Sequence, residues 1–384
     1  MRLLIVSRFD RSARAINTII KYVRVGKSLG HEVALFCDPM DDLPDVPTSR
    51  DPKTFDYVMF VVYETSDFPD LPYLAYLLDG VPRERRIIVD CTGRYNETIQ
   101  VEYDFNHLEK MDNHMGWEWV DGFDAVAKTI LQPTLEPVRP DVHGFLFHGF
   151  DPAAVEYHYD TAAEAASAWA GKGREQKKYG MIYIGNNWQR WSQMRSLLQQ
   201  IEPIQQSIGP ICLAGWAWDY RPDWAVELGI QGIDTDPAML QCMGVEVRGN
   251  IAFDQVIGVI NQARFCPVIQ RPLFNHLGFV TNRTFETFCS DTIPLLILPH
   301  QMIESIYGPA ARLLAVGEDV ASQIQDIMRC PDVYWDAVLK TRTYLANRHA
   351  FQRRFQELSA ILKQLYHTHQ ERGYADLVCD GPAG

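Results

Sequence analysis

Arg283 and Glu286 stand three positions apart in a stretch, residues 282–289, whose pattern predicts a helix. Side chains at this spacing lie on one helix face and can act on one ligand. A carboxylate accepts hydrogen bonds from both hydroxyls of a ribose, and a guanidinium near a helix start neutralises a diphosphate. The pair can therefore act on one ligand, with a simple ion pair on a helix surface as the alternative.

A second anion-binding candidate is the turn that contains Gly185, Asn186 and Arg190, between a predicted strand and a predicted helix. Backbone N–H groups and the dipole at a helix start favour an anion, and Arg190 would add positive charge. Trp216 follows the next predicted strand, where its indole could stack on a base or a sugar ring. Core packing explains a single tryptophan equally well, but Trp216 and Trp218 flank one alanine at a strand end, which favours a site.

The N-terminal turn and the helix after it are rich in cations. Six basic residues accompany one acid, Asp10; they are Arg8, Arg11, Arg14, Lys21, Arg24 and Lys27. This excess indicates a patch for an anionic acceptor or a membrane surface, or else a solvated helix face. Arg8, Asp10 and Arg11 are therefore the candidates on the acceptor side.

Asp90 ends a predicted strand, the position where α/β proteins commonly place ligand-binding groups. Its carboxylate could orient a hydroxyl group or take its proton, so Asp90 is the candidate catalytic residue. A plain turn between strand and loop is the alternative.

Neither a metal nor a redox cofactor is predicted. The histidines His107, His114, His143 and His148 lack the i, i+4 spacing and the carboxylate of a zinc-binding helix. The turn after the first strand has no G-x-G-x-x-G pattern, which disfavours a nicotinamide enzyme.

The candidates must be positioned by alternating strands and helices. In the first half, strands are predicted over residues 1–6, 31–36, 57–63, 86–90, 125–127 and 144–147, with helices ending at Leu29 and spanning 73–78. This alternation predicts a parallel sheet with helices on both faces.

The second half repeats that architecture after an alanine-rich, charged stretch. Strands are predicted over 181–184, 211–214, 245–248 and 293–298, and helices over 190–201, 253–263 and 282–289. The last helix carries an apolar stripe of Phe351, Phe355, Leu358, Leu362 and Leu365. We expect an N-terminal domain over 1–150, a second domain over 151–347, and a C-terminal helix, about 348–384, that packs back on the first domain.

Composition sets the class of protein. The 384 residues, 47% of them hydrophobic, suffice for two domains with cores of their own. The 36 Lys and Arg against 49 Asp and Glu give a net charge of −13, which argues against nucleic acid as a partner. The eight cysteines form no C-x-x-C pair, and no apolar run reaches the ~20 residues of a membrane span. A cytoplasmic protein with reduced thiols is expected.

The segments 249–254 and 281–296 carry a likeness to a known family. Gly249-Asn250-Ile251-Ala252-Phe253 precedes a helix, and Arg283-Thr284-Phe285-Glu286 precedes a turn and a strand led by Pro294. Here the chain resembles the GT-B glycosyltransferases, in particular the group 1, family 4-like enzymes and their spore-maturation-protein-like branch. The resemblance implies an α/β fold of two Rossmann-like, doubly wound domains that face each other across a cleft.

The same resemblance implies that a sugar moves from a nucleoside diphosphate donor, a UDP-sugar first among them, without a metal. The donor-binding residues would be Gly185, Asn186, Arg190, Trp216, Arg283, Thr284 and Glu286. The acceptor, a saccharide, a lipid-linked group, a protein or a small molecule, would bind residues 1–150, and peripheral membrane contact stays open.

The chain departs from the family pattern at Gly278, where many family 4 enzymes have a second glutamate, and it lacks a lysine between Arg190 and Arg195. Two alternatives therefore stand beside a glycosyltransferase. One is a nucleotide-sugar epimerase on the same fold. The other is a catalytically silent protein that binds sugar nucleotides.

Overall fold

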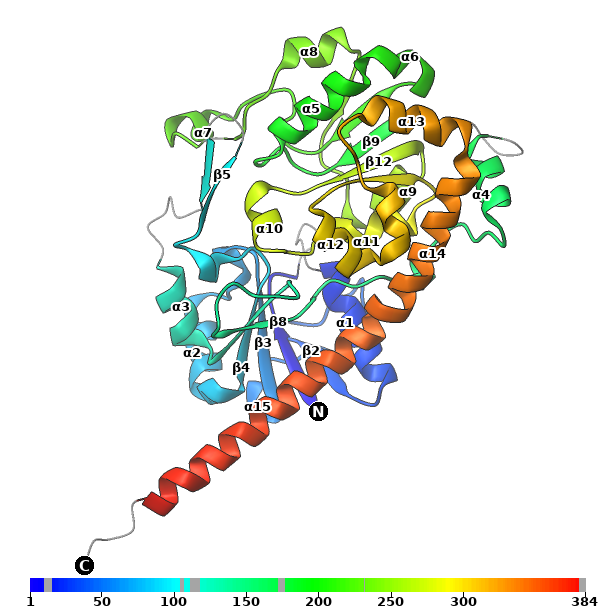
Figure 1. Cartoon of the computed structure of the whole chain (residues 1–384). Coiled ribbons are helices and arrows are strands. Elements are labelled where there is room, and N and C mark those ends of the chain that lie inside the picture. The colour runs from blue at the N-terminus through cyan, green and yellow to red at the C-terminus, as the bar shows by residue number, and fades with distance from the viewer. Residues whose placement is uncertain (10–15, 104–106, 111–117, 172–176, 231, 380–384) are drawn as a thin grey trace, which may run out of the picture. The chain divides into compact units, whose positions relative to one another are not determined.

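The computed structural model describes residues 1–9, 16–103, 107–110, 118–171, 177–230 and 232–379 (Figure 1). The chain divides into two compact units. Unit 1 comprises residues 1–97, 115–148 and 351–384, and unit 2 comprises 98–114 and 149–350. Among the described residues, no helix is both long enough and apolar enough to cross a membrane.

Unit 1 is built on a parallel sheet of six strands in the order β2-β1-β3-β4-β7-β8. The strands are β1 (Arg2–Val6), β2 (Glu32–Leu35), β3 (Tyr57–Val62), β4 (Arg86–Asp90), β7 (Thr129–Gln132) and β8 (Val142–Gly144). Every residue of β3 and β4 is buried, because helices cover both faces of a parallel sheet. The predicted parallel sheet is confirmed.

Two apolar cores lie on the opposite faces of this sheet. One contains residues of α1 (Ile16–Ser28) and of the last helix, α15 (Phe351–Cys379), whose Phe351, Phe355, Leu358 and Leu362 are buried. The other contains residues of α2 (Leu71–Gly80) and α3 (Trp119–Val126). The apolar stripe of α15 is therefore part of the core of unit 1.

Two strand predictions in unit 1 were wrong. Residues 125 and 126 are the last two of α3, and Ala127 is its C-cap. The helix forms because Trp119, Phe123 and Val126 recur at helical spacing. A short apolar run alone does not distinguish a strand from a helix. The strand predicted over 144–147 is β8, which lies two residues earlier. Its neighbour β7 ends at Gln132, which pairs with Gly144, so β7 offers no further residue for pairing after Gly144.

Unit 2 has a parallel sheet of five strands in the order β11-β10-β9-β12-β13. They are β9 (Tyr179–Ile184), β10 (Ile211–Ala214), β11 (Glu246–Arg248), β12 (Ala263–Ile269) and β13 (Ile293–Ile297). The helices are α4 (Ala162–Trp169), α5 (Trp191–Ile201), α6 (Gln205–Ile208), α7 (Asp223–Glu227), α8 (Pro237–Cys242), α9 (Val256–Ile260), α10 (Pro272–His276), α11 (Asn282–Cys289), α12 (His300–Tyr307), α13 (Val320–Arg329) and α14 (Pro331–His349).

Strand β12 was not predicted, and the helix expected over 253–263 ends at Ile260. Arg264 and Pro267 interrupt the apolar pattern of β12, and a proline argues against a central strand. The strand tolerates Pro267 because its pairing with β9 ends at Phe265, and beyond that point β12 pairs with β13.

A two-stranded hairpin, β5 (Gln100–Tyr103) and β6 (His107–Lys110), belongs to unit 2 although both neighbouring segments of the chain belong to unit 1. Ile99 and Val101 pack against the core that surrounds α10. The structural division therefore differs from the predicted boundary, which assigned all of residues 1–150 to the first domain.

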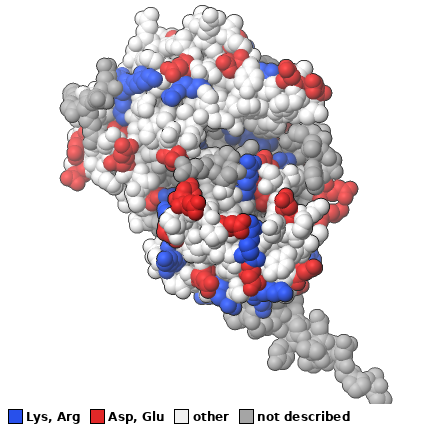
Figure 2. Space-filling model, turned by 180° about the vertical axis from the view of Figure 1, so that it is seen from behind, with Lys and Arg blue, Asp and Glu red and all other residues white. Residues whose placement is uncertain are grey.

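The surface charges are mixed. Figure 2 shows one face of the molecule, on which Lys and Arg side chains are interspersed with Asp and Glu. No extended basic area is visible among the described residues on that face.

Candidate functional site

Two arginines predicted to bind a diphosphate both influence Tyr183, near the carboxyl end of β9. Tyr183, the penultimate residue of β9, is fully buried, and burial raises the pKa of its hydroxyl. The positive charges of Arg190 and Arg283 both oppose this rise in the pKa of Tyr183. Arg190 precedes α5 and Arg283 is in the first turn of α11. Two cations that are 93 positions apart in the sequence thus act on the same buried hydroxyl.

Helix α11 presents Arg283 and Glu286 as an ion pair. Arg283 Nη1 lies 3.0 Å from Glu286 Oε2, and the side chains are 18% and 20% exposed. The pair is thus partly desolvated, which strengthens its interaction with any charged ligand. The expectation that the two side chains share one helix face is confirmed.

Thr284 has a different role from the one predicted. Its side chain is fully buried, and its Oγ1 accepts hydrogen bonds from the backbone N–H of Thr281 at 3.3 Å and from Gln270 Nε2 at 3.5 Å. Thr281 and Thr284 form a reciprocal capping box at the start of α11. The geometry therefore gives Thr284 the task of fixing the helix start that carries Arg283.

The turn after β9 is held closely against the turn after β10. Gly215 has a φ of +142°, and a Cβ atom there would lie 2.2 Å from the carbonyl oxygen of Gly185. Asn186 Oδ1 accepts a hydrogen bond from the Trp216 backbone N–H at 3.2 Å, and Arg190 Nη1 donates to the Asn186 carbonyl at 3.1 Å. Gly185, Asn186 and Arg190 therefore shape the turn, and only a glycine fits at position 215.

Trp216 contacts other indoles. Its ring centroid lies 6.2 Å from that of Trp188 and 5.7 Å from that of Trp224, with interplanar angles of 23° and 16°. Trp188 comes from the turn after β9 and Trp224 from α7. The predicted stacking residue is thus one of three, and the other two were missed because they are distant in sequence.

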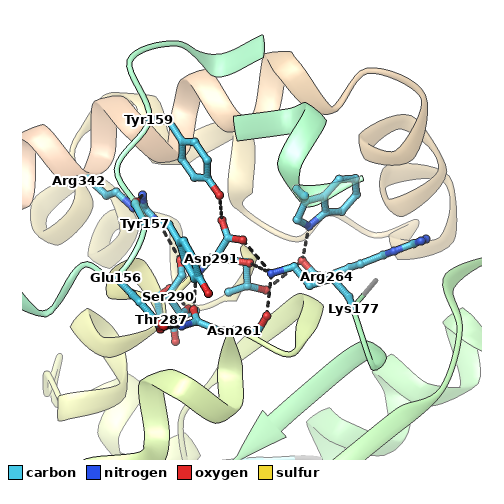
Figure 3. Close-up of polar contacts among 12 residues, drawn as sticks. Glu156, Tyr157, Tyr159, Lys177, Asn261, Arg264, Thr287, Ser290, Asp291 and Arg342 are labelled. Atoms are coloured by element: carbon cyan, nitrogen blue, oxygen red, sulfur yellow. Dashed lines mark hydrogen bonds and ion pairs between the residues drawn. The ribbon is translucent and has the colours of Figure 1, made fainter. Parts of the chain in front are cut away.

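A buried polar cluster anchors the carboxyl end of α11 (Figure 3). Lys177 Nζ lies 2.9 Å from Asp291 Oδ2, and Tyr159 donates a hydrogen bond of 2.7 Å to Asp291 Oδ1. Arg342 of α14 donates to the carbonyl oxygens of Phe288 at 2.8 Å and Ser290 at 2.7 Å. These bonds satisfy carbonyls that a helix end leaves free, and they hold rigid the helix that carries Arg283 and Glu286.

The hairpin β5–β6 contributes two further contacts that sequence reasoning missed. Glu109 pairs with Arg271, and Tyr103 donates a hydrogen bond to Gln189 in the turn after β9. No local pattern signals these contacts, because each joins residues more than 80 positions apart.

Asp90, the candidate catalytic residue, is fully buried in unit 1. Its oxygens accept hydrogen bonds of 2.9 Å from the backbone N–H groups of Arg94 and Tyr95 and from Gln132 Nε2. Burial raises the pKa of the Asp90 carboxyl, and these hydrogen bonds oppose the rise. This geometry favours a structural role, in which Asp90 holds the loop after β4.

His148, which sequence reasoning did not treat as a site residue, lies in a buried group of unit 1. Its Nδ1 is 3.3 Å from Thr18 Oγ1 and its Nε2 is 3.2 Å from Tyr63 Oη. Burial lowers the pKa of His148 to about 3, so the ring is neutral at physiological pH. Of the acceptor-side candidates, Arg8 is exposed, and Asp10 and Arg11 lie outside the described residues.

No metal site was predicted from the sequence. Within the described ranges, no three His, Cys, Asp or Glu side chains are grouped as a metal site would require. One Asp-x-Asp pattern, Asp234 and Asp236, escaped sequence reasoning. Asp234 pairs with Arg221 at 3.5 Å, and Asp236 Oδ1 accepts from the Met239 backbone N–H at 2.9 Å to cap α8.

No known protein family matches the sequence, and no curated protein is similar to it. Solved structures are similar in fold. An alpha-glucosyltransferase in complex with UDP-glucose and DNA containing an abasic site has a TM-score of 0.62 and 12% identity over 94% of this chain and 99% of its own. A DNA modifying enzyme, beta-glucosyltransferase, studied with and without uridine diphosphoglucose, has a TM-score of 0.52 and 13% identity over 93% and 99%. The T4 phage BGT with UDP and Mn²⁺ has a TM-score of 0.51 and 14% identity over 93% and 99%.

These likenesses show that the chain has the fold of GT-B glucosyltransferases, which confirms the predicted fold class. They do not support the narrower resemblance to the spore-maturation-protein-like branch. They also leave without support the expectation, drawn from net charge, that nucleic acid is excluded as a partner, since proteins of this fold are seen with DNA.

Proposed function

We propose that the protein is a glycosyltransferase that takes a hexose from a UDP-sugar. The observation that carries this proposal is the Arg283–Glu286 ion pair on α11, and it is supported by Arg190, whose charge acts with that of Arg283 on the buried Tyr183 near the carboxyl end of β9. Parallel sheets of this kind bind nucleotides at that edge. The presence of UDP or UDP-glucose in the structures of similar fold supports uridine and glucose as the first choices.

Each of the three side chains has a task in this reaction. Glu286 accepts hydrogen bonds from the two ribose hydroxyls, and Arg283 and Arg190 neutralise the diphosphate. The bond between the anomeric carbon and the phosphate oxygen breaks, and the negative charge that develops on the leaving UDP is stabilised by fixed cations and by the amino end of α11. Two guanidinium groups supply this charge without a metal, so we propose a metal-independent reaction.

For the acceptor, we propose a hydroxyl group on a modified base of DNA. The unmodified bases carry no alcohol, so a hydroxymethylated pyrimidine is the simplest base that can accept a glycosyl group. The description of one protein of this fold as a DNA modifying enzyme supports this choice. The net charge of −13 predicts weak general affinity for DNA with a shallow dependence on salt, so recognition would rest on the modified base.

The burial of Asp90 leaves its assignment as the catalytic base without support, and we propose no base in its place. Gly278, where a second glutamate was expected by resemblance, has a φ of +62°, a conformation that favours glycine over glutamate. The backbone conformation at position 278 therefore explains why a glycine and not a glutamate is found there.

The decisive experiment has two steps. Thermal unfolding is measured with UDP-, GDP-, ADP-, CMP- and dTDP-sugars, and selective binding of UDP-glucose is expected to raise the melting temperature. Radiolabelled UDP-glucose is then incubated with duplex DNA that contains 5-hydroxymethylpyrimidines, with unmodified DNA as the control. Label on the modified DNA alone is expected.

Other outcomes choose between the alternatives. An altered sugar nucleotide formed without any acceptor would identify an epimerase. Binding of UDP-glucose without transfer to DNA, saccharide or lipid-linked acceptors would identify a silent binding protein. Absence of binding to every sugar nucleotide would overturn the proposal.

A further inference from the structure

The three indoles of Trp188, Trp216 and Trp224 form a cluster that the proposed donor site does not use. The third centroid distance, between Trp188 and Trp224, is 6.0 Å with an interplanar angle of 18°. Since the three separations are nearly equal, the rings form a compact group with roughly parallel faces and not a linear stack. Trp224 is 37% exposed, so one side of the group is accessible to a ligand.

The accessible side of the indole group forms an open hollow. It is lined by Trp216, Tyr220, Arg221, Asp223, Trp224 and Glu227, among others. Its volume is about 560 Å³, and it is widely open to solvent. Tyr220 is 48% exposed. Large aromatic side chains at the surface commonly mark a contact site, because exposing them to water is unfavourable.

The backbone next to two tryptophans of the cluster is strained. Gln189 and Ala217 have φ values of +55° and +62°, and they are the two positive-φ residues other than glycine in the described part of the chain. Such conformations are uncommon for residues with a Cβ and concentrate at functional sites. Asn187 Nδ2 donates to the carbonyl oxygens of Ala217 at 2.7 Å and Asp234 at 2.8 Å, which stabilises this arrangement. Both strained residues are adjacent to a tryptophan of the cluster.

The charged side chains that line the hollow favour some classes of ligand over others. Asp223 and Glu227 are exposed. Arg221 pairs with Asp234 and donates a hydrogen bond of 2.7 Å to the Ile230 carbonyl. Of the described residues that line the hollow, Arg221 is the only cation. The two carboxylates therefore repel a phosphate, and they offer acceptors to a neutral ligand that has several hydroxyl groups.

We propose that this hollow is a binding site for a neutral sugar ring of the gluco configuration. The equatorial hydroxyls of such a ring leave C–H groups on its faces, so one face packs on the indoles while the edge hydroxyls donate to Asp223 and Glu227. A nucleobase has an aromatic face as well, but in a nucleotide or a nucleic acid it carries phosphate into an acidic hollow. The site lies next to the turn after β9 and is distinct from Arg283 and Glu286.

The test measures binding of cellotriose to the full chain by tryptophan fluorescence and calorimetry. We expect a dissociation constant in the millimolar range, weakened about tenfold or more by Trp224→Ala and little changed by Trp224→Phe, which keeps an aromatic face. The double variant Asp223→Asn, Glu227→Gln should weaken cellotriose binding several-fold, although all three indole rings remain. Tyr76→Ala, at a tyrosine with 40% exposure in unit 1, is the control and should change nothing.

Three outcomes would overturn the proposal: absence of cellotriose binding, binding that is unaffected by Trp224→Ala, or tighter binding of a thymidine trinucleotide that requires Trp224. If Trp224→Ala fails to fold, the carboxylate double variant decides. The affinity for UDP-glucose is measured on the same variants and should stay unchanged. Cellotriose binding without UDP-glucose binding would contradict the proposed function and leave this site standing.

Discussion

Glu109 binds Arg271 and the start of α10 at the same time. One carboxylate oxygen pairs with Arg271 Nε, and the other accepts a hydrogen bond of 2.8 Å from the Leu273 backbone N–H. The Glu109 side chain is completely buried. A carboxylate from the hairpin thereby fixes the segment that follows β12 at the edge of the candidate donor site.

The first prediction concerns this pair. Arg271→Met should lower the free energy of unfolding by about 3 kcal/mol, because it leaves the buried Glu109 charge without its cation. Adding Glu109→Gln should restore part of the loss, since the amide still accepts from Leu273 and carries no charge. Urea denaturation of both single variants and the double variant measures the coupling. Additive losses would show that the two side chains do not interact.

The second prediction concerns donor binding. Glu286→Gln should weaken UDP-glucose binding by about 1–3 kcal/mol, because the charged acceptor for the ribose diol is lost while the shape is kept. Asp336→Asn is the matched control, because Asp336 also forms an ion pair within a helix, with Lys340 at 2.6 Å, but on α14. Calorimetry compares the two. Equal affinity in wild type and a folded Glu286→Gln variant would remove Glu286 from the site.

A third prediction follows from His148, whose pKa is lowered to about 3 by burial. The unfolded chain binds a proton on this side chain below pH ~6.5, and the folded chain does not until about pH 3. The contribution of His148 to the free energy of unfolding is therefore complete above pH ~6.5. It declines as the pH falls, by about 2 kcal/mol between pH 6.5 and 5. Denaturation at pH 7.5 and 5 should show a smaller loss in His148→Gln than in wild type. Equal losses would mean that His148 is protonated in the folded state.

The fourth prediction is that glycosyl transfer survives EDTA, because Arg190 and Arg283 supply the charge for the leaving diphosphate. Turnover of UDP-glucose is measured with EDTA, after dialysis, and with added Mn²⁺. Loss of activity that Mn²⁺ restores would show a metal-dependent reaction and would direct attention to Asp234 and Asp236.

The fifth prediction tests the contact between α1 and α15. A Cβ atom on Gly26 would lie 2.5 Å from Val33 Cγ2 and 2.7 Å from Phe355 Cε2. Gly26→Ala should therefore destabilise the protein by about 1–3 kcal/mol through overpacking. Gly122→Ala in α3 is the control, since nothing lies within 4 Å of its added Cβ, and it should stabilise by about 0.5–1 kcal/mol. Thermal unfolding that ranks the two variants in the opposite order would contradict the packing.

The amino-acid sequence was sufficient to predict the features that depend on neighbouring residues. The run 57–62 is apolar throughout and 87–89 is the apolar centre of 86–90, as strands covered on both faces require, and the alternation with helices specified two parallel sheets. Helical periodicity placed Arg283 and Glu286 on one face. It also predicted the apolar stripe of the last helix, since a period of 3.6 residues is a local property.

Contacts between residues that are distant in the sequence could not be predicted in this way. Glu109 and Arg271 are 162 positions apart, and their pairing depends on how the hairpin packs against α10. Asp90 looks like a ligand-binding residue at a strand end, but its loop folds over it and uses both carboxylate oxygens. Three tryptophans from three segments gather into one cluster. Such contacts arise from packing and sheet order, which local propensity and periodicity do not encode.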